Sequence, residues 1–492
     1  RNFACSKERN FSKPFCVKMS DQKETEQTKE NKESELGQTD VRVAVVGNVD
    51  CGKSTLIGVL TSGVLDNGRG LARARVFMHN HEASSGRTSS VSHHIMGFDE
   101  NKKAVHQTVA ASANAAAKSK SWGHIVEKSR QVLTFIDLAG HEKYLKTTIG
   151  GLTGCFPDFA MVLINSLAGI TKMTKEHLGV VIALKIPLFV VVTKVDMAPA
   201  NVLEQTKKTL TRALRSPSAG KRLPVTVREE KDVSTVLNNP SPTVVPIFYL
   251  SCVTGENLPL LELYLAGLQP NKTWEEKEAS EDQAEFHIDQ TFSVPGVGVV
   301  LSGTMCEGKM TAHQDLLLGP FSDGSFKSVF VRSVHCKRTA VETAEAGVNC
   351  AVSIRSNNRK DLLKRENIRP GMVMVHPNVK PQAAVAFIAE VLVLHHPSTI
   401  KIRYQAVIHC GIIRQTAAIT EINQECLRTG DKALVTFRFM VRPEYLKTGL
   451  TFVFREGNTK GIGKIVQLLH EYKNPLERKS RYRGKELSPA AQ

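Results

Sequence analysis

The segment GNVDCGKS, from Gly47 to Ser54, combines glycines with one lysine and one serine in the spacing GxxxxGK[ST]. Glycines allow backbone N–H groups to wrap phosphate oxygens, and a helix that begins here points its positive end at them. Lys53 can place a point charge on terminal phosphates, and Ser54 can ligate Mg²⁺. The spacing therefore predicts a phosphate-binding loop.

The segment DLAGH, from Asp137 to His141, supplies a carboxylate, a glycine and an imidazole. Asp137 can hold Mg²⁺ through water, and the Gly140 N–H can donate to a γ-phosphate. His141 then lies where a side chain can orient an attacking water. Taken alone, the motif is better explained as an Asp-capped turn with an incidental histidine.

Two further motifs, TKVD from Thr193 to Asp196 and SCV from Ser251 to Val253, suit a purine base. The Asp196 carboxylate can accept hydrogen bonds from guanine N1–H and N2–H₂, a donor pair that adenine lacks. The Lys194 stem can lie over the base, and the backbone N–H groups of SCV can meet guanine O6. For each motif alone, an ordinary turn at a strand end is the alternative.

The joint placement of the four motifs decides between these interpretations. Five apolar runs rich in β-branched residues alternate with helix-like stretches, which predicts a doubly wound α/β domain with a parallel sheet. The runs are VRVAVV from Val41, VLTFI from Val132, FAMVLI from Phe159, PLFVVV from Pro187 and VVPIFYL from Val244. The motifs directly follow four of these runs, in chain order. They therefore meet at the carboxyl edge of one sheet and predict a guanine-nucleotide site.

The composition narrows the class of protein. The chain has 492 residues and a formal net charge of +17, which favours a polyanionic partner, most simply nucleic acid. Ten cysteines without a CxxC pair argue against a zinc ribbon or a disulfide framework and favour reduced thiols in the cytoplasm. No run of about 18 apolar residues without charges is present, so we expect no membrane insertion.

The motifs resemble those of the translational GTPases, the class of elongation factor Tu and elongation factor one-alpha, in which the histidine of DLAGH is characteristic. The resemblance is strongest to the GTP-binding protein one and two family. It rests on TSGVLDNGRG, HNHEASSGRTSSVSHHIMGFD, FIDLAGHEKYLKTT, MTKEHLG, VPGVGVVLSGT, RPGMVMV, LVLHHPSTI, HCGIIRQTA, LRTGDKA and FVFREGNTKGIG. It covers about residues 41–468 and implies a P-loop GTPase domain followed by two β-barrels.

The resemblance and the composition together predict how the chain is divided. Residues 20–40 are almost free of apolar side chains, an acidic stretch follows Pro270, and short strands with Gly, Pro and Asp turns begin near Phe286. Because the chain opens on Arg1, Met19 is a candidate start. We expect a disordered segment 1–40, a GTPase domain 41–270, a linker 271–285, a first barrel 286–379, a second barrel 380–468 and a basic tail 469–492.

The resemblance also implies roles for individual residues. The catalytic residue is His141, with Val49 on one side of a hydrophobic gate before it. Mg²⁺ is held by Ser54, Thr88 and Asp137, and Asp50 lies near a monovalent cation where one binds. The expected nucleotide-binding residues are Gly47, Asn48, Val49, Asp50, Cys51, Gly52, Lys53, Ser54, Thr55, Asp137, Gly140, Thr193, Lys194, Asp196, Met197, Ser251, Cys252 and Val253.

Three positions depart from the elongation-factor pattern. Thr193 stands where asparagine is usual, so we expect one contact to guanine to weaken. Arg87 replaces the usual isoleucine before Thr88, so half of the gate is absent or rebuilt; we expect Arg87 to be solvated rather than to stabilise transition-state charge. Cys51 lies within the phosphate loop, where a helix N-terminus lowers a thiol pKa, but we favour a simple requirement for a small residue.

A cluster of histidines and one glutamate precedes and follows Thr88: His79, His81, Glu82, His93 and His94. These residue types can ligate zinc. A polar switch segment that responds to the nucleotide is the better interpretation.

The expected function is that of an elongation factor, which uses Mg²⁺-dependent hydrolysis of GTP to GDP to change its affinity for aminoacyl-tRNA and the ribosome. One alternative is a GTPase switch in mRNA surveillance that engages RNA-decay machinery without delivering tRNA. A second is a regulatory GTPase at a membrane or the cytoskeleton, against which His141 and the two β segments argue. The sequence does not separate delivery from surveillance, because both need a basic face and a nucleotide switch.

Overall fold

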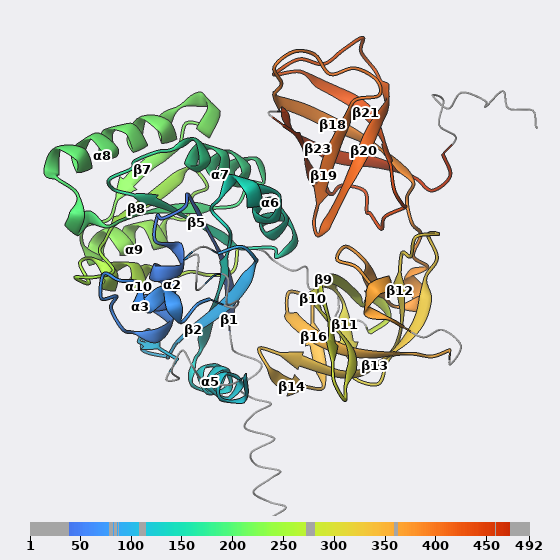
Figure 1. Ribbon diagram of the computed structural model, residues 1–492, viewed down its shortest axis with the longest axis horizontal. Coiled ribbons are helices and arrows are strands. Elements are labelled where there is room, and N and C mark those ends of the chain that lie inside the picture. The colour runs from blue at the N-terminus through green and yellow to red at the C-terminus, as the bar shows by residue number, and fades with distance from the viewer. Residues whose placement is uncertain are drawn as a thin grey trace, which may run out of the picture.

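The computed structural model describes residues 39–77, 82, 86, 88–107, 115–271, 281–358, 363–457 and 459–472. The predicted disordered segment 1–40 and the basic tail 469–492 lie almost wholly outside these residues, as do Arg87 and most of the linker 271–285. The described part forms an amino-terminal α/β domain and two carboxy-terminal β domains (Figure 1). Among the described helices, none is long and apolar enough to cross a membrane.

The amino-terminal domain is built on an eight-stranded sheet. In sheet order, the strands are β3 (Ala104–Val105), β2 (Ser92–Phe98), β4 (Gln131–Asp137), β1 (Thr39–Gly47), β5 (Phe159–Asn165), β6 (Leu188–Thr193), β8 (Val244–Tyr249) and β7 (Leu223–Thr226). Six strands are parallel, but β2 is antiparallel to β4 and β3 to β2, so the sheet is mixed rather than wholly parallel. The α/β prediction is thus confirmed, with an antiparallel extension at one edge.

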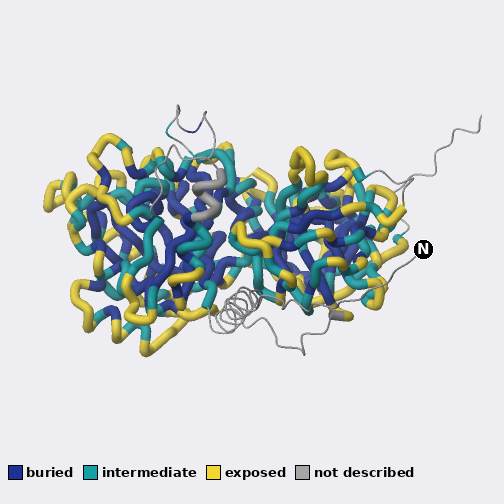
Figure 2. The backbone as a smooth tube through the Cα atoms, turned by 90° about the horizontal axis from the view of Figure 1, so that it is seen from below, coloured by how far each residue is buried: buried dark blue, intermediate teal, exposed yellow. Residues whose placement is uncertain are grey.

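Helices cover both faces of this sheet. They are α2 (Lys53–Ser62), α3 (Leu71–Ala74), α5 (Ala115–Lys128), α6 (Leu145–Gly154), α7 (Lys172–Ala183), α8 (Ala200–Arg215), α9 (Glu230–Asn238) and α10 (Leu258–Ala266). One core joins the sheet to α2, α3, α9 and α10, and the other joins it to α6, α7 and α8. The apolar runs form strands because both of their faces meet a helix layer, which removes them from water (Figure 2).

The first β domain closes on itself. Its strands are β9 (Glu285–Val294), β10 (Gly298–Glu307), β11 (Lys309–Thr311), β12 (Asp315–Gly319), β13 (Lys327–Cys336), β14 (Thr339–Val341), β15 (Thr343–Glu345), β16 (Asn349–Ser356) and β17 (Val373–Val375). Pairing of β12 with β13 joins six of them into a ring around a single core. Closure leaves few unpaired strand edges.

The second β domain is a closed six-stranded barrel in the order β18-β21-β20-β19-β22-β23. Its strands are β18 (Ala386–His395), β19 (Gln405–Cys410), β20 (Ile413–Ile422), β21 (Lys432–Phe439), β22 (Thr451–Glu456) and β23 (Thr459–Leu469). Stacked and edge-on phenylalanines, among them Phe387, Phe437 and Phe452, fill its interior. The predicted order of one α/β domain and two barrels is therefore confirmed.

A buried carboxylate joins the two barrels. Glu285, at the start of β9, accepts a hydrogen bond at 2.8 Å from the Tyr445 hydroxyl of the second barrel. Its carboxylate also lies 2.7 Å from His287 Nε2 and 2.7 Å from Lys447 Nζ, and Lys447 reaches Glu307 at 2.8 Å. Because Glu285 is only 3% exposed, this network holds the barrels together at a dry junction.

The α/β domain contacts both barrels. Against the first, Lys337 Nζ lies 3.5 Å from Asp40, and the Arg338 guanidinium lies 4.5 Å from the ring centre of Trp122 on α5. Against the second, Glu176 on α7 pairs with Arg455 at 3.2 Å and with Lys460. All three domains are therefore in contact through charged or aromatic side chains.

The network around Glu285 predicts a pH-dependent junction. Burial alone would raise the pKa of Glu285, but His287 and Lys447 hold it at about 2. Burial would lower the pKa of His287, but Cys306 and Glu285 raise it to about 10. The glutamate's contribution is complete above its ordinary pKa of 4.5 and is lost as the pH falls toward 2. The histidine's contribution is complete below 6.5 and is lost as the pH rises toward 10.

We expect Glu285→Gln to destabilise the barrel pair by about 3 kcal/mol, because it leaves buried cations without their counter-charge. The difference from the unmodified protein should be greatest between pH 4.5 and 6.5 and should shrink at higher pH. Hydrogen exchange of the β9 amides measures it. Glu307→Gln, which removes only the more exposed partner of Lys447, is the control. Equal exchange in the two variants would contradict the assignment.

Candidate nucleotide site

The phosphate loop connects β1 to α2 at the carboxyl edge of the sheet. Gly52, directly before α2, has φ +87°, a left-handed conformation that glycine adopts without strain. Lys53 is 7% exposed, and its Nζ donates to Gly47 O at 3.2 Å and Asn48 O at 2.9 Å. The loop thus curls around its own lysine, with the ammonium group held at its centre.

The three predicted Mg²⁺ ligands meet beside this loop. Ser54 Oγ donates to Asp137 Oδ2 at 2.8 Å, and Thr88 Oγ1 donates to the same oxygen at 3.1 Å. The hydroxyls of Ser54 and Thr88 are 2.8 Å apart. The other carboxylate oxygen, Asp137 Oδ1, is buried and has no hydrogen-bond partner. Two hydroxyls and a carboxylate with an unused oxygen form a hard-oxygen donor set, which fits Mg²⁺.

The Asp137 carboxylate is fully enclosed. Burial raises its pKa, while Lys53 and the hydroxyls of Ser54 and Thr88 act in the opposite direction. A buried carboxylate needs positive charge close to it, which a divalent cation would supply.

Gly140 lies against the phosphate loop with no room for a side chain. A Cβ on this residue would come within 2.6 Å of Gly47 O. Only glycine therefore allows the DLAGH loop to approach the phosphate loop so closely.

His141 follows on the exposed rim, where its Nδ1 accepts a hydrogen bond from Lys143 N at 3.1 Å. A neutral ring held in this way carries its proton on Nε2.

A cavity of about 60 Å³ separates these loops. Val49, Asp50, Thr88 and His141 all line it, so the predicted gate residue, cation neighbour, switch residue and catalytic residue come together. Arg73, from α3, also lines this cavity and was not predicted. The segment NGRGLARAR has no spacing that marks one arginine as facing phosphate, so sequence reasoning had no signal for it.

The base-binding motifs lie on the neighbouring strand ends. Thr193 is 2% exposed, and its hydroxyl donates to Cys51 O in the phosphate loop at 2.8 Å. This side chain therefore braces the loop rather than facing the base. Lys194 adopts a left-handed conformation with φ +60°, and Asp196 is exposed beside it. Such an exposed carboxylate is accessible to the guanine edge.

The SCV loop is shaped by its own serine. The buried Ser251 hydroxyl accepts hydrogen bonds from the N–H groups of Val253 and Thr254, both at 3.2 Å. Cys252 O accepts from Asp66 N at 2.9 Å, and the Asp66 carboxylate in turn accepts from Gly68 N and Ala72 N. The base-side loop is therefore tied to the segment that leads into α3.

The structure also places Cys51 and part of the histidine and glutamate cluster around Thr88. Cys51 is 1% exposed, and burial raises its thiol pKa although Lys53 acts against this, which supports the need for a small residue rather than a reactive thiol. Glu82 Oε1 accepts from Ser89 N at 2.8 Å and Ser90 N at 3.3 Å, so it anchors the Thr88 loop. His79 and His81 lie outside the described residues. Among those described, no group of three His, Cys, Asp or Glu could hold a metal ion.

Comparison with known proteins agrees with this arrangement. The family described as elongation factor Tu GTP binding domain matches residues 38–270. GTP-binding protein 1 of Xenopus laevis is 52% identical over 436 residues, which cover 88% of this chain and 64% of that protein. GTP-binding protein 2 of Mus musculus is 43% identical over 433 residues, which cover 87% of this chain and 69% of that protein.

A solved structure shares the fold at low identity. The Ski7 GTPase-like domain of S. cerevisiae, bound to GTP, superposes with a TM-score of 0.66 at 12% identity over 88% of this chain and 99% of that chain. The curated relatives are longer than this chain, which spans about two thirds of their length. On the identity to those relatives, the chain belongs to the family of GTP-binding proteins 1 and 2, and its first domain matches the elongation factor Tu GTP binding domain.

Proposed function

We propose that the chain acts as a cytoplasmic translation elongation factor, which hydrolyses GTP and thereby changes its affinity for aminoacyl-tRNA and the ribosome. One observation carries the proposal: the Thr88 hydroxyl lies within hydrogen-bond distance of both Ser54 and Asp137. The loop that bears Thr88 therefore closes onto the site of the terminal phosphates. A loop that contacts this site is the element that a nucleotide switch requires.

In this proposal, the chain's own groups position the triphosphate. The backbone N–H groups of the phosphate loop and Lys53 hold its β- and γ-phosphates, and Gly140 donates its N–H to the γ-phosphate. Ser54, Thr88 and Asp137 hold Mg²⁺, which when bound neutralises charge on the phosphate oxygens. These three ligands already lie within 3.1 Å of one another.

The same proposal assigns the attacking water to His141. Its Nδ1 accepts from Lys143 N, so Nε2–H is available to donate to a water in front of the γ-phosphate. Val49 lines the same cavity and would exclude other waters. Loss of the γ-phosphate would release Thr88.

The switch would reach the barrels through the α/β domain's contacts with them. Glu176 on α7 binds Arg455 and Lys460 of the second barrel, and Asp40 on β1 binds Lys337 of the first. A ligand that contacts the GTPase domain and both barrels would sense any change in their arrangement. Aminoacyl-tRNA would be such a ligand. It is an extended polyanion, which fits the chain's net charge of +17.

Asp196→Asn should lower GTP affinity about 100-fold or more and raise affinity for xanthosine triphosphate, because an amide presents a donor where the carboxylate accepted. Competition binding with GTP, XTP and ATP measures this. Glu204→Gln, on the exposed side of α8, is the control and should bind like the parent. Unchanged GTP affinity in Asp196→Asn would show that Asp196 does not contact the base.

His141→Ala should keep GTP affinity but slow stimulated hydrolysis on the order of 100-fold, because it removes the group that orients water. Single-turnover hydrolysis, with nucleotide binding measured in parallel, separates the two effects. The neighbouring exposed Glu142→Gln should leave both unchanged. Parental hydrolysis in His141→Ala would exclude the assigned role.

The form bound to a non-hydrolysable GTP analogue should bind aminoacyl-tRNA more tightly than the GDP form, since only the first orders the Thr88 loop. Binding of charged and uncharged tRNA, measured with each nucleotide across a salt series, provides the test. Indifference to both nucleotide and charging would reject tRNA delivery. Retained RNA binding in that case would favour the alternative, a GTPase switch in mRNA surveillance or decay.

A further inference from the structure

Two cysteines of the first barrel lie directly opposite each other on neighbouring strands. Cys336 ends β13, Cys350 lies near the start of β16, and the antiparallel register of these strands pairs the two residues. Opposite residues of an antiparallel pair point to the same face, with Cα atoms about 4.5 to 5.5 Å apart. A disulfide spans this separation without movement of the backbone. Both side chains are free thiols.

The two thiols differ in their access to solvent. Cys336 is half-buried at the edge of the barrel core, whereas Cys350 is 2% exposed and belongs to that core. The neighbouring Cys336 thiol and burial raise the pKa of the Cys350 thiol. Cys336 is therefore the thiol that an oxidant in solution reaches first, and Cys350 is a protonated partner beside it.

The pair lies at the base of two turns that hold the first barrel against the GTPase domain. In the turn that follows β13, Lys337 Nζ lies 3.5 Å from Asp40. In the turn that precedes β16, Gly347 O accepts a hydrogen bond from the Arg42 guanidinium. Asp40 and Arg42 both belong to β1, the strand that leads into the phosphate loop. The two cysteines thus join the turns that grip this strand.

The turn after β13 has an unfavourable backbone conformation. Cys336 pairs with Thr339 across it, and the two residues between them, Lys337 and Arg338, have φ values of +46° and +70°. Residues other than glycine adopt this left-handed conformation at a cost of about 1 kcal/mol or more, which the surroundings must offset. The Arg338 guanidinium lies 4.5 Å from the ring centre of Trp122. Contacts with the GTPase domain therefore stabilise the turn.

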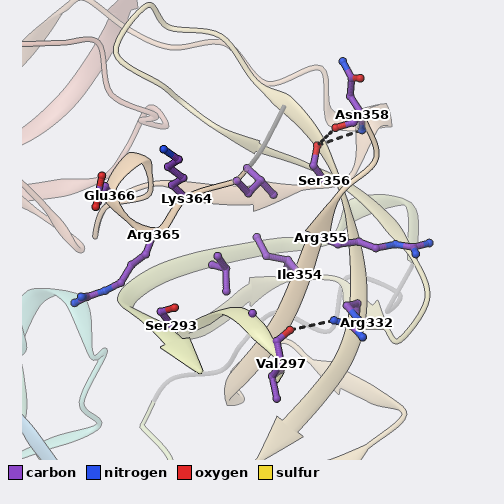
Figure 3. Close-up of a pocket in the computed structure, with 13 residues that line it drawn as sticks. Ser293, Val297, Arg332, Ile354, Arg355, Ser356, Asn358, Lys364, Arg365 and Glu366 are labelled. Carbon is purple, nitrogen blue, oxygen red and sulfur yellow. Dashed lines mark hydrogen bonds between the residues drawn. The ribbon is translucent and has the colours of Figure 1, made fainter. Parts of the chain in front are cut away.

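The other end of the same strand pair has different surroundings. There Val331 pairs with Ile354, and Ile354 and Arg332 border a cavity whose described lining residues all belong to the first barrel (Figure 3). At the cysteine end, Cys350 instead lines a cavity of about 300 Å³ between the domains, to which Trp122 of the GTPase domain contributes. This space gives hydrogen peroxide, a molecule little larger than water, a path to the pair.

We propose that Cys336 and Cys350 are a peroxide-sensitive dithiol, whose oxidation to a disulfide locks the two turns that bind β1. The Cys336 thiolate attacks one oxygen of hydrogen peroxide, and the O–O bond breaks. Cys336 becomes a sulfenic acid, and the departing hydroxide takes up the proton that Cys336 lost, which gives one water.

The Cys350 sulfur then attacks the sulfenic sulfur of Cys336. The S–S bond forms, the S–O bond breaks, and a second water leaves with the Cys350 proton. Two electrons pass from the two thiols to the peroxide, and a dithiol reductant returns them. The new bond closes a loop of 15 residues, from residue 336 to residue 350, which contains both turns.

The test uses the full chain, treated with hydrogen peroxide, unfolded with its remaining thiols alkylated, and digested with trypsin. Cleavage after Arg332, Lys337, Arg338 and Arg355 places the two cysteines in separate peptides, 333–337 and 339–355. Mass spectrometry then detects a disulfide as a linked pair of these peptides that is lighter by two hydrogen atoms and separates on reduction.

The linked pair should form in the parent and in Cys426→Ala, a control that removes a half-buried thiol of the second barrel. It should be absent from Cys336→Ala and from the more conservative Cys336→Ser. Hydrogen exchange of the amides between residues 337 and 349 should become about 10-fold slower on oxidation of the parent and the control, because the cross-link restricts opening of the loop. In the Cys336 variants, peroxide should leave this exchange unchanged.

Three results would overturn the proposal. The first is a Cys336 that oxidises to its sulfinic acid without a linked peptide. The second is a disulfide that joins Cys350 to Cys155, which lines the same cavity between the domains, in place of Cys336. The third is a linked pair that forms while exchange in the two turns stays as fast as in the reduced protein.

Discussion

The Asp137 carboxylate is the point through which the nucleotide site is assembled. It ends β4, is wholly buried, and accepts hydrogen bonds from the first turn of α2 and from the Thr88 loop. Three chain segments separated by 34 to 83 residues therefore depend on one acceptor. Burial of a charge in this way is unfavourable unless cations and donors surround it, so the phosphate loop, Lys53 and Thr88 must all be in place together.

The packing of the phosphate loop explains why two of the three departures from the elongation-factor pattern are compatible with the fold. Thr193 was expected to weaken a guanine contact, yet its hydroxyl is turned toward Cys51 O and stiffens the phosphate loop from the base side. Cys51 fits beneath that loop because it is small and uncharged when buried. Both changes therefore act on the packing of the phosphate loop.

Local motifs predicted which residues meet at the carboxyl edge of the sheet, because these residues lie at strand ends whose positions the sheet fixes. Ser54, Asp137 and His141 were identified from the joint placement of their motifs after strand runs, and Thr88 from the family resemblance; the structure brings all four to one edge. The antiparallel strand β2 was missed, since HHIMGF lies within a motif that suggested a polar switch segment.

Long-range pairings were beyond sequence reasoning for a different reason. Glu285 and Tyr445 are 160 residues apart, and neither has a spacing that marks the other as its partner. The same holds for Glu176 with Arg455 and Lys460. Such contacts depend on how the folded domains are oriented relative to one another. The pattern of apolar and polar residues along the sequence does not encode that orientation.

The dry junction at Glu285 has a consequence for how domain motion can be observed. Two barrels fastened by a buried carboxylate, a tyrosine and a lysine move as one body, so their position relative to the GTPase domain has six degrees of freedom rather than twelve. A few distances between dyes on the GTPase domain and dyes on either barrel would then define the movement of both barrels relative to that domain. Probes placed on different barrels would report one trajectory with one relaxation time.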